Sequence, residues 1–453
     1  MILDRSKPPQ PGPITLIGFP KFITTKTPGG TPIYLVENHS QPLVSVTLYI
    51  RGGSAEDTLS TEGLAGMSAE LLTKGTASRT ATEIAEQIDF VGGSLGAGAS
   101  SDSSTISTSV LTRFLPTALD LFADVTLNPA FAGAELDRAK LQRLAGIMQA
   151  KSDPGYLSET IFSRIVFDSH PYSLQSSGTE ESIPSFTSES LRSHYLSIAL
   201  PNNAFFVAAG DITESDLVSM LAARFEAWEA GSVKLSEVAA PKLQSSNRVA
   251  VVEKAQAVQS AIRVGHIGIP RKHNDYIACY VLNMLLGGYF NSRINLNLRE
   301  KNGFTYGARS FFDTRKQTGA FAVSTEVRTE VTARAIEEII NELRLIGKTP
   351  VSNEELSMVK NYIIGSFPLS IETPQQVASR IATLALYGLA PDYYDTFRDT
   401  VAALTAEDLL RAAETYIHPD SVTIAASGDA KVLANDLRSF GDVEVYDHDF
   451  VKV

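Results

Sequence analysis

The stretch Phe186-Thr-Ser-Glu-Ser-Leu191, followed by Tyr195 and then Val207-Ala-Ala-Gly-Asp211, occurs a second time in the chain. The second copy reads Leu404-Thr-Ala-Glu-Asp-Leu409, then Tyr416, then Ala425-Ala-Ser-Gly-Asp429, at an offset of 218 residues (429 minus 211). Glu135-Leu-Asp-Arg-Ala-Lys140 is similarly repeated as Glu355-Leu-Ser-Met-Val-Lys360. Solenoid repeats have periods of only about 20 to 50 residues, so this longer period indicates a duplicated domain.

Each copy has the same predicted order of elements. A strand is followed by a helix, a pair of strands, two long helical stretches and a last strand that ends in Gly-Asp. The first strand and helix are expected at 44–51 and 64–72 in one copy, and at 261–269 and 276–286 in the other. Paired strands and runs of helices favour an α+β fold over a doubly wound parallel sheet. We predict two homologous domains, each a mixed or antiparallel sheet packed with helices, in a clamshell architecture.

Composition changes suggest where the domains begin and end. A proline-rich, charged lead occupies residues 1–19, and a polar stretch with few aromatic residues occupies 231–247. We expect the first domain at 20–230 and the second at 248–453, joined by a linker long enough to let them face each other across a cleft.

Length and charge exclude several classes of function. The chain has 453 residues and a formal net charge of −12, which is the wrong sign for binding a phosphate backbone, so no nucleic acid partner is expected. No stretch of 18 apolar residues occurs, so no membrane span is expected, and no export signal is visible. The single cysteine, Cys279, lies in an apolar run and is interpreted as a buried core thiol.

The usual catalytic motifs are missing. No two of the seven histidines are four residues apart, so the helical zinc pair His-x-x-x-His is absent. Neither a Gly-x-Ser-x-Gly elbow nor a phosphate-binding Gly-x-x-x-x-Gly-Lys-Ser/Thr motif occurs. Asp447-His448-Asp449 is the one local cluster of metal-ligand types, and we interpret it as a solvated tail.

An ordered set of short motifs carries a family resemblance. Gly63-Leu-Ala65 is followed by Lys74-Gly-Thr76, Val91-Gly-Gly93 and His170-Pro-Tyr172, and then by the segment Ser292-Arg-Ile to Tyr306-Gly307. This order and the duplication resemble the pitrilysin (insulinase-like) zinc metallopeptidases over about residues 20–435. The resemblance implies an α+β fold and proteolysis.

The resemblance also shows what has been lost. In that family the first helix reads Gly-Leu-Ala-His-x-x-Glu-His, with two zinc ligands and a glutamate that acts as the general base. The matching positions here are Gly66, Ala69 and Glu70, and the third ligand, a glutamate, would fall at Ala145 or Gly146. All four functional side chains are absent, so we predict no metal and no cofactor in this chain.

A second set of positions matches the family. Arg299 and Tyr306 match an Arg and a Tyr that, in relatives, reach over the zinc site of the opposite half and contact the scissile peptide. The alternative is that Arg299 pairs with Glu300 and Tyr306 packs as a strand residue. Gly287 and Gly288 match a glycine-rich substrate-sensing loop, or else form a helix-ending turn. The strand containing Gly96, Ala97 and Gly98 matches an edge strand to which extended peptide adds, or else forms a tightly packed turn.

These expectations define one principal function and two alternatives. We expect a zinc-lacking subunit of a two-chain metalloendopeptidase, which forms half of an enclosed chamber for peptides or unfolded protein. Its partner, bearing His-x-x-Glu-His and zinc, would complete a heterodimer or heterotetramer, although a homodimer is also open. The alternatives are an inert scaffold or peptide-binding protein, and a self-sufficient peptidase that uses other residues. The resemblance favours a periplasmic over a cytoplasmic location.

Overall fold

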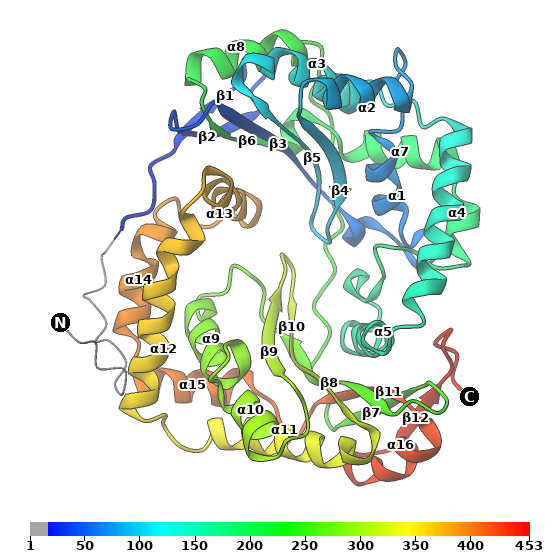
Figure 1. Ribbon diagram of the computed structural model, residues 1–453, viewed down its shortest axis with the longest axis vertical. Helices are drawn as coiled ribbons and strands as arrows, with labels where there is room; N and C mark the ends of the chain where they lie inside the picture. The colour runs from blue at the N-terminus through cyan, green and yellow to red at the C-terminus, as the bar shows by residue number, and fades with distance from the viewer. Residues whose placement is uncertain (1–16) are drawn as a thin grey trace, which may run out of the picture.

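The structure of the protein is a computed structural model that describes residues 17–453. The lead expected at residues 1–19 therefore lies outside the described residues, except for its last three. Within the described part of the chain, no helix is both long enough and apolar enough to cross a membrane. Figure 1 shows two halves, each built around a twisted sheet.

The first sheet is mixed and has six strands in the spatial order β1-β2-β6-β3-β5-β4. Its one parallel pair is β2 with β6, and all the other neighbours are antiparallel. The strands are β1 (Ile23–Lys26), β2 (Pro32–Glu37), β3 (Leu43–Arg51), β4 (Ser94–Ala99), β5 (Ser103–Leu111) and β6 (Ala204–Gly210).

The second sheet has the order β12-β7-β11-β8-β10-β9 and repeats the first over its last five strands, whereas its outer strand β12 pairs parallel and comes from the end of the chain. Here β7 is parallel to both β11 and β12, and β9, β10 and β8 are antiparallel neighbours. The strands are β7 (Arg248–Glu253), β8 (Gln259–Gly268), β9 (Ala308–Thr314), β10 (Gly319–Arg328), β11 (Thr423–Gly428) and β12 (Val443–Tyr446). The predicted α+β fold with two homologous, mixed sheets is confirmed.

Helices follow the strands in the same order in both halves. The first half contains α1 (Leu64–Leu71), α2 (Ala81–Phe90), α3 (Leu115–Leu127), α4 (Gly133–Ala150), α5 (Pro154–Phe167), α6 (Ser182–Ser185), α7 (Ser188–Ile198) and α8 (Glu214–Phe225). The second contains α9 (Tyr276–Asn283), α10 (Arg293–Asn295), α11 (Thr332–Ile346), α12 (Asn353–Ser366), α13 (Pro374–Tyr387), α14 (Tyr393–Ala403), α15 (Ala406–Tyr416) and α16 (Ala430–Asp436). Residues 226–247 contain neither helix nor strand.

Each half places one helix on the sheet of the other half. Helix α13 contacts β6, β2 and β3, and helix α5 contacts β11, β8 and β7. Both helices lie between the two sheets in Figure 1. Strands β6 and β11 are consequently buried along their whole length. The face of the second sheet that meets α5 is lined by small residues, which allow the helix to approach closely; these are Ala250, Ala320, Ala322 and Ala425.

A buried polar contact joins the two halves at Asp102, in the turn between β4 and β5. The Asp102 carboxylate accepts hydrogen bonds from the Tyr172 hydroxyl, from the Lys316 backbone N–H at 2.9 Å and from the Tyr387 hydroxyl at 3.4 Å. Lys316 lies in the turn between β9 and β10, and Tyr387 ends α13, so three distant segments meet on one carboxylate. Burial, followed by the nearby Asp102 charge, raises the pKa of Tyr387 to about 12, which keeps this phenol a donor at neutral pH.

We predict that Asp102→Ala lowers the free energy of unfolding by about 2–4 kcal/mol, because buried donors lose their acceptor. Urea unfolding of the purified chain measures the change. Asp89→Ala, on the exposed end of α2, is the control and should change stability by less than about 0.5 kcal/mol. Equal losses of unfolding free energy in both variants would show that the Asp102 hydrogen bonds do not stabilise the fold more than an exposed carboxylate does.

Candidate functional site

Helix α1 carries the positions where the family motif would place its ligands. Its N-terminus is held by Asp57, whose two carboxylate oxygens accept from the Gly63 N–H at 3.0 Å and the Ala65 N–H at 3.1 Å. Gly63 has φ +90° and approaches the backbone of Gly178 so closely that a Cβ would overlap it. The start of α1 is therefore fixed against the loop that follows His170-Pro171-Tyr172.

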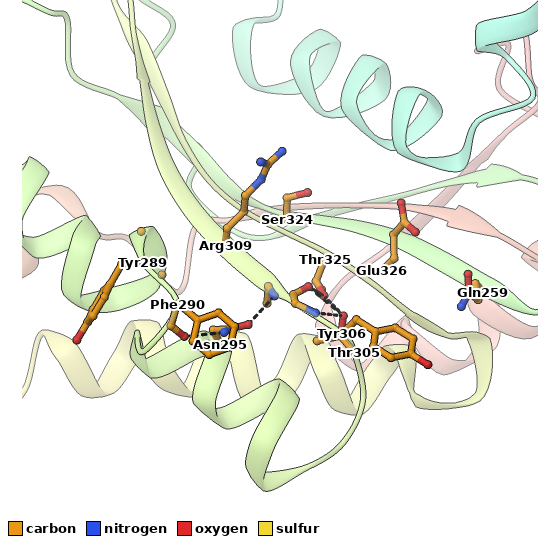
Figure 2. A pocket seen from close by; sticks show the side chains of 14 residues that line it. Gln259, Tyr289, Phe290, Asn295, Thr305, Tyr306, Arg309, Ser324, Thr325 and Glu326 are labelled. Atoms are coloured by element: carbon orange, nitrogen blue, oxygen red, sulfur yellow. Dashed lines mark hydrogen bonds between the residues drawn. The ribbon is translucent and has the colours of Figure 1, made fainter. Parts of the chain in front are cut away.

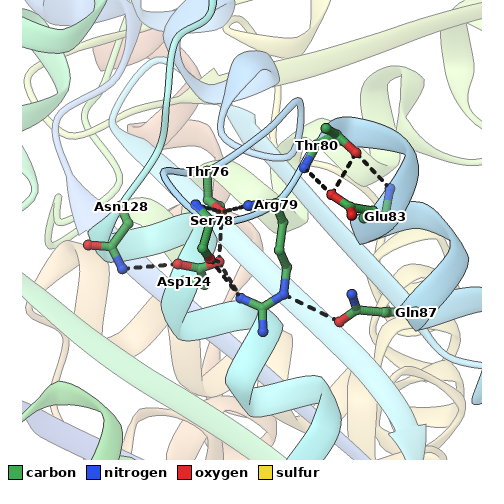
Figure 3. Close-up of polar contacts among 8 residues, drawn as sticks. All are labelled: Thr76, Ser78, Arg79, Thr80, Glu83, Gln87, Asp124 and Asn128. Carbon is green, nitrogen blue, oxygen red and sulfur yellow. Dashed lines mark hydrogen bonds and ion pairs between the residues drawn. The ribbon is translucent and has the colours of Figure 1, made fainter.

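The Lys74-Gly75-Thr76 segment after α1 is anchored on α3. Asp124 accepts hydrogen bonds from Thr76 Oγ1 at 2.7 Å and Asn128 Nδ2 at 3.0 Å, and it pairs with Arg79 (Figure 3). Burial alone would raise the pKa of Asp124, but these hydrogen bonds and the Arg79 charge outweigh it and hold the pKa below its usual value. This matched motif is thus a structural anchor.

An ion pair lies at the positions of the degenerate zinc motif. Glu70 on α1 pairs with Arg143 on α4, and Arg143 Nη1 also donates to the Ser176 carbonyl at 3.4 Å. A Cβ added at Gly66 would overlap that same carbonyl oxygen and lie 3.6 Å from Arg143 Nη1. The Arg143 guanidinium, a cation belonging to the chain, therefore lies beside both positions where the family has histidine ligands.

The α4 side offers no replacement ligand. Gly146 lines a cavity of about 370 Å³ together with Glu70, Arg143 and Tyr156, whereas Ala145 does not line it. Ala69 is buried. Among residues 17–453 no group of three or more His, Cys, Asp or Glu side chains is placed to hold a metal ion. With Glu70 already neutralised by Arg143, the residues present do not fit the zinc of the family.

Two other candidates for chemistry in this chain are placed by the structure. Cys279 is 1% exposed, and burial raises the pKa of its thiol to about 12, so it is not a thiolate nucleophile at neutral pH. Asp449 pairs with Lys151 at 2.5 Å and fastens the C-terminal tail to the end of α4. His448 and Asp449 are exposed to solvent, as expected from the sequence, and the ion pair fixes this solvated tail to the surface.

Arg299 and Tyr306 lie on a helical segment and the loop after it. Ile294 and Leu298, four residues apart, are buried and fix the segment that continues α10, and Gly303, with φ +63°, follows its end. The Arg299 guanidinium lies 4.6 Å from the centre of the Phe290 ring and 3.5 Å from a Glu300 oxygen. Tyr306 is 97% exposed. The Glu300 contact expected as the alternative for Arg299 exists, but Tyr306 does not pack as a strand residue.

A pocket of about 620 Å³ connects several of the predicted positions. Its lining includes Gly287, Gly288, Phe290, Tyr306 and Arg309. Figure 2 shows Tyr289 at one end of the lining residues and Tyr306 well separated from it, towards Gln259. Arg299 does not line it, and contacts it through Phe290. Gly287 packs tightly against Ser310, so its lack of a side chain is required by packing as well as by the turn.

Strand β4, with Gly96, Ala97 and Gly98, is the outer strand of the first sheet. It pairs with β5 on one side, and no described strand pairs with its other side. A Cβ at Gly98 would contact nothing within 4 Å, and one at Gly96 only the Ser107 hydroxyl at 3.9 Å. The strand is an open edge, and the tightly packed turn considered as the alternative is not what these glycines form.

The sequence interpretation missed Arg143, Ser176 and Asp57. Arg143 and Gly146 are three residues apart on one helix, which places them on the same face. This spacing was a usable signal, because a basic residue one turn before the lost glutamate position faces α1. The Ser176 and Asp57 contacts come from loops and had no comparable signal.

The fold and the site define a class: an α+β protein of two homologous halves whose motif helix lacks the side chains of a metallopeptidase. Comparison with known proteins agrees with this class. Residues 33–179 match the profile described as "Insulinase (Peptidase family M16)", and residues 185–363 match "Peptidase M16 inactive domain". The two matches together span more than half of the chain, and the chain belongs to the insulinase family of peptidases.

Relatives carry names of two kinds. "Uncharacterized zinc protease YmxG" of Bacillus subtilis is 25% identical over 78% of this chain and 85% of its own length. "Non-peptidase homolog YmxG" of Helicobacter pylori is 24% identical over 88% of this chain and 92% of its own. The crystal structure of a peptidase M16 inactive domain from Pseudomonas fluorescens is 25% identical, with a TM-score of 0.85, covering 90% of this chain and 98% of that one.

We predict that glycine-to-alanine substitution has opposite effects on stability at Gly66 and Gly146, the two glycines at lost-ligand positions. Gly66→Ala should destabilise the chain by about 1–3 kcal/mol, because the new Cβ displaces the Ser176 carbonyl. Gly146→Ala, where nothing lies within 4 Å, should stabilise α4 by about 0.5–1 kcal/mol. Urea unfolding of both variants measures this, and stabilisation by Gly66→Ala would contradict the closed site.

The stability of α1 should depend on pH through Asp57. Burial, only partly opposed by the Gly63 and Ala65 hydrogen bonds, raises the pKa of Asp57 from 3.8 to about 7. The folded state thus binds this proton more tightly than the unfolded state does. Its contribution to stability is greatest below pH 3.8 and decreases as the pH rises towards about 7.

We predict that Asp57→Asn flattens this dependence. The free energy of unfolding, measured by urea titration at about pH 4, 5.5 and 7, should fall more steeply for the natural chain than for the variant. Burial also raises the pKa of Glu62. Both proteins contain Glu62, so the difference between them comes from Asp57. Parallel curves for the two proteins would show that Asp57 does not titrate in this range.

Proposed function

We propose that this chain is the zinc-lacking subunit of a two-chain peptidase. One observation carries the proposal: Arg143 pairs with Glu70 beside the lost ligand positions, while Tyr306, in the matched Arg/Tyr segment, is 97% exposed to solvent. A phenol that makes no described hydrogen bond within the fold is available to a molecule outside it. The partner is a related chain that bears His-x-x-Glu-His and zinc.

Arg299 and Tyr306 have a defined role in this proposal. Both donate hydrogen bonds to the carbonyl oxygen of the scissile peptide as negative charge develops on it. The Phe290 ring supports the Arg299 guanidinium by a cation–π contact and limits its rotation. Arg299 does not line the pocket beside Tyr306. Its guanidinium therefore reaches the scissile peptide either from its present position or after rotating past Phe290.

The chamber walls supply substrate contacts. The open edge of β4 at Gly96, Ala97 and Gly98 suits main-chain pairing with an extended peptide, and the small side chains leave its backbone accessible. Gly287 and Gly288 lie in the wall of the pocket next to Tyr306. These contacts fit peptides or unfolded segments and give little selection for sequence.

A second candidate is an inert scaffold or peptide-binding protein that keeps the fold. The name of the Helicobacter pylori relative, a non-peptidase homolog, favours this candidate. The two proposals differ in whether a zinc-bearing partner makes the pair active.

The deciding experiment measures zinc content and cleavage of a quenched fluorescent peptide. It uses this chain alone, the His-x-x-Glu-His relative from the same genome alone, and a mixture of the two. Activity that rises only in the mixture supports the subunit proposal. A stable complex without a gain in activity supports the scaffold, and activity of this chain alone contradicts both.

We predict that Arg299→Ala or Tyr306→Phe lowers turnover by the active pair about 10-fold to 1000-fold, as expected when a transition-state donor is lost. Steady-state kinetics with the same peptide provides the measurement. Arg344→Ala on α11 and Tyr362→Phe on α12 are controls outside the pocket lining and should leave turnover unchanged. Assembly of each variant pair is checked by size-exclusion chromatography, and normal turnover by assembled pairs would refute the role.

A further inference from the structure

A second, more enclosed cavity lies among the helices of the second half. It measures about 100 Å³ and is bordered by residues of α9, α12, α13 and α14. Its walls are largely aromatic. They include Tyr276, Tyr280, Phe367, Tyr393, Tyr394 and Phe397.

Two arginines also line this cavity, and neither forms an ion pair with another described residue. Arg271 is only 7% exposed, and its Nη1 has no hydrogen-bond partner among residues 17–453. Its guanidinium lies 3.8 Å from the centre of the Tyr276 ring and 5.0 Å from that of Tyr393. Arg380 on α13 lies 5.5 Å from the Tyr394 ring. Aromatic faces attract a guanidinium but do not accept its directed hydrogen bonds as an oxygen does.

The tyrosines add further donors without partners. The hydroxyls of Tyr393 and Tyr394 are buried. The Tyr394 hydroxyl makes no hydrogen bond within the described chain, and the Tyr393 hydroxyl has only the Arg271 guanidinium beside it, which leaves its own proton without an acceptor. Burial raises the pKa of Tyr393 to about 12, so its phenol is a proton donor at neutral pH. Buried polar groups are nearly always paired, and a concentration of exceptions at one cavity calls for an explanation.

An acceptor with negative charge would satisfy these donors and also neutralise the two guanidinium groups. No Asp or Glu lines the cavity, so nothing in its wall neutralises Arg271 or Arg380. A metal cation is excluded by the two guanidinium charges. A buried charge without a partner of opposite charge lowers the stability of the fold. The chain has a formal net charge of −12 and many carboxylates, but none of them lines this cavity.

Size and wall chemistry narrow the choice of anion. The volume equals roughly three water molecules, enough for one carboxylate group with a short hydrocarbon tail. A guanidinium donates two parallel hydrogen bonds to a carboxylate, and aromatic rings suit the tail. A phosphate would present four solvated oxygens to these rings and would leave most of them unpaired.

We propose that this cavity, the arginine–tyrosine cavity, is a binding site for a short monocarboxylate. Arg271 binds the carboxylate oxygens, Tyr393 and Tyr394 donate to them, and Phe367 and Phe397 enclose the tail. The site lies where the halves meet, because Phe19 stacks on Tyr394 with ring centres 5.0 Å apart and α13 continues onto the first sheet. This ligand site is separate from the pocket beside Tyr306 and independent of the proposed peptidase role.

The test uses the full chain and sodium propionate as the probe, with sodium chloride at the same concentration as the reference. Saturation-transfer NMR should detect propionate bound to the natural chain. Propionate at about 10 mM should raise its melting temperature by about 2 °C relative to chloride. Both signals should disappear in Arg271→Gln and persist in Arg344→Gln, in which a surface arginine paired with Asp420 is replaced.

Stability separates a ligand site from a structural role. Without propionate, Arg271→Gln should melt at or above the temperature of the natural chain, because it removes an unpaired buried charge. If that variant does not fold, Arg380→Gln, which is less buried, takes its place and should weaken the propionate signal at least 5-fold. No signal with the natural chain, an unchanged signal in Arg271→Gln, or an equal melting shift with inorganic phosphate would overturn the proposal.

Discussion

The contact on which the two halves depend is the buried Asp102 carboxylate. It accepts hydrogen bonds from Tyr172 in its own half and from Lys316 and Tyr387 in the other half. Around it, α5 covers the second sheet and α13 covers the first, so neither sheet is completely covered by its own half. Burying both faces of each sheet by this exchange removes far more apolar surface from water than an end-to-end contact would. The two halves of the chain therefore form one structural unit, and the position of each candidate site follows from that unit.

The same packing explains why the degenerate zinc motif is not merely a site with missing side chains. The carbonyl of Ser176 occupies the space that a Gly66 side chain would need, and Arg143 reaches across from α4 to neutralise Glu70. The loop at 175–178 is in turn tied to the start of α1, through Gln175 on Glu62 and Gly178 on Gly63. Restoring ligand side chains one at a time would meet a backbone that has closed over their places. The site is repacked, which is consistent with a chain whose chemistry lies elsewhere.

Much of the fold could be predicted from the sequence, because duplication and periodicity are local signals. The strand expected at 44–51 is β3, Leu43–Arg51, and the helix expected at 64–72 is α1, Leu64–Leu71. The helix expected at 276–286 ends as α9 at Asn283 and continues as a π-helical turn to Gly288. The exchange of α5 and α13 could not be predicted, because an apolar helix face does not specify which sheet it covers. Asp102 and Ser176 also gave no signal, because they lie in loops themselves and their partners are 33 to 285 residues away in the sequence.

Three arginines of this chain illustrate how the surroundings of an arginine decide its role. Arg143 is paired with Glu70 and closes a site, so its charge is already used within the fold. Arg299 rests on Phe290 with only a 3.5 Å contact to Glu300, and its side chain is 34% exposed to solvent. Arg271 is buried among tyrosines with no carboxylate lining the same cavity, and its Nη1 has no hydrogen-bond partner among the described residues. A fold tolerates a buried guanidinium when ligand binding compensates its desolvation cost. An anion interacts more strongly with a buried arginine than with an exposed one, because the surroundings screen the charges less than water does. The buried arginine is therefore better explained by an acceptor from outside the chain than by any contact within it.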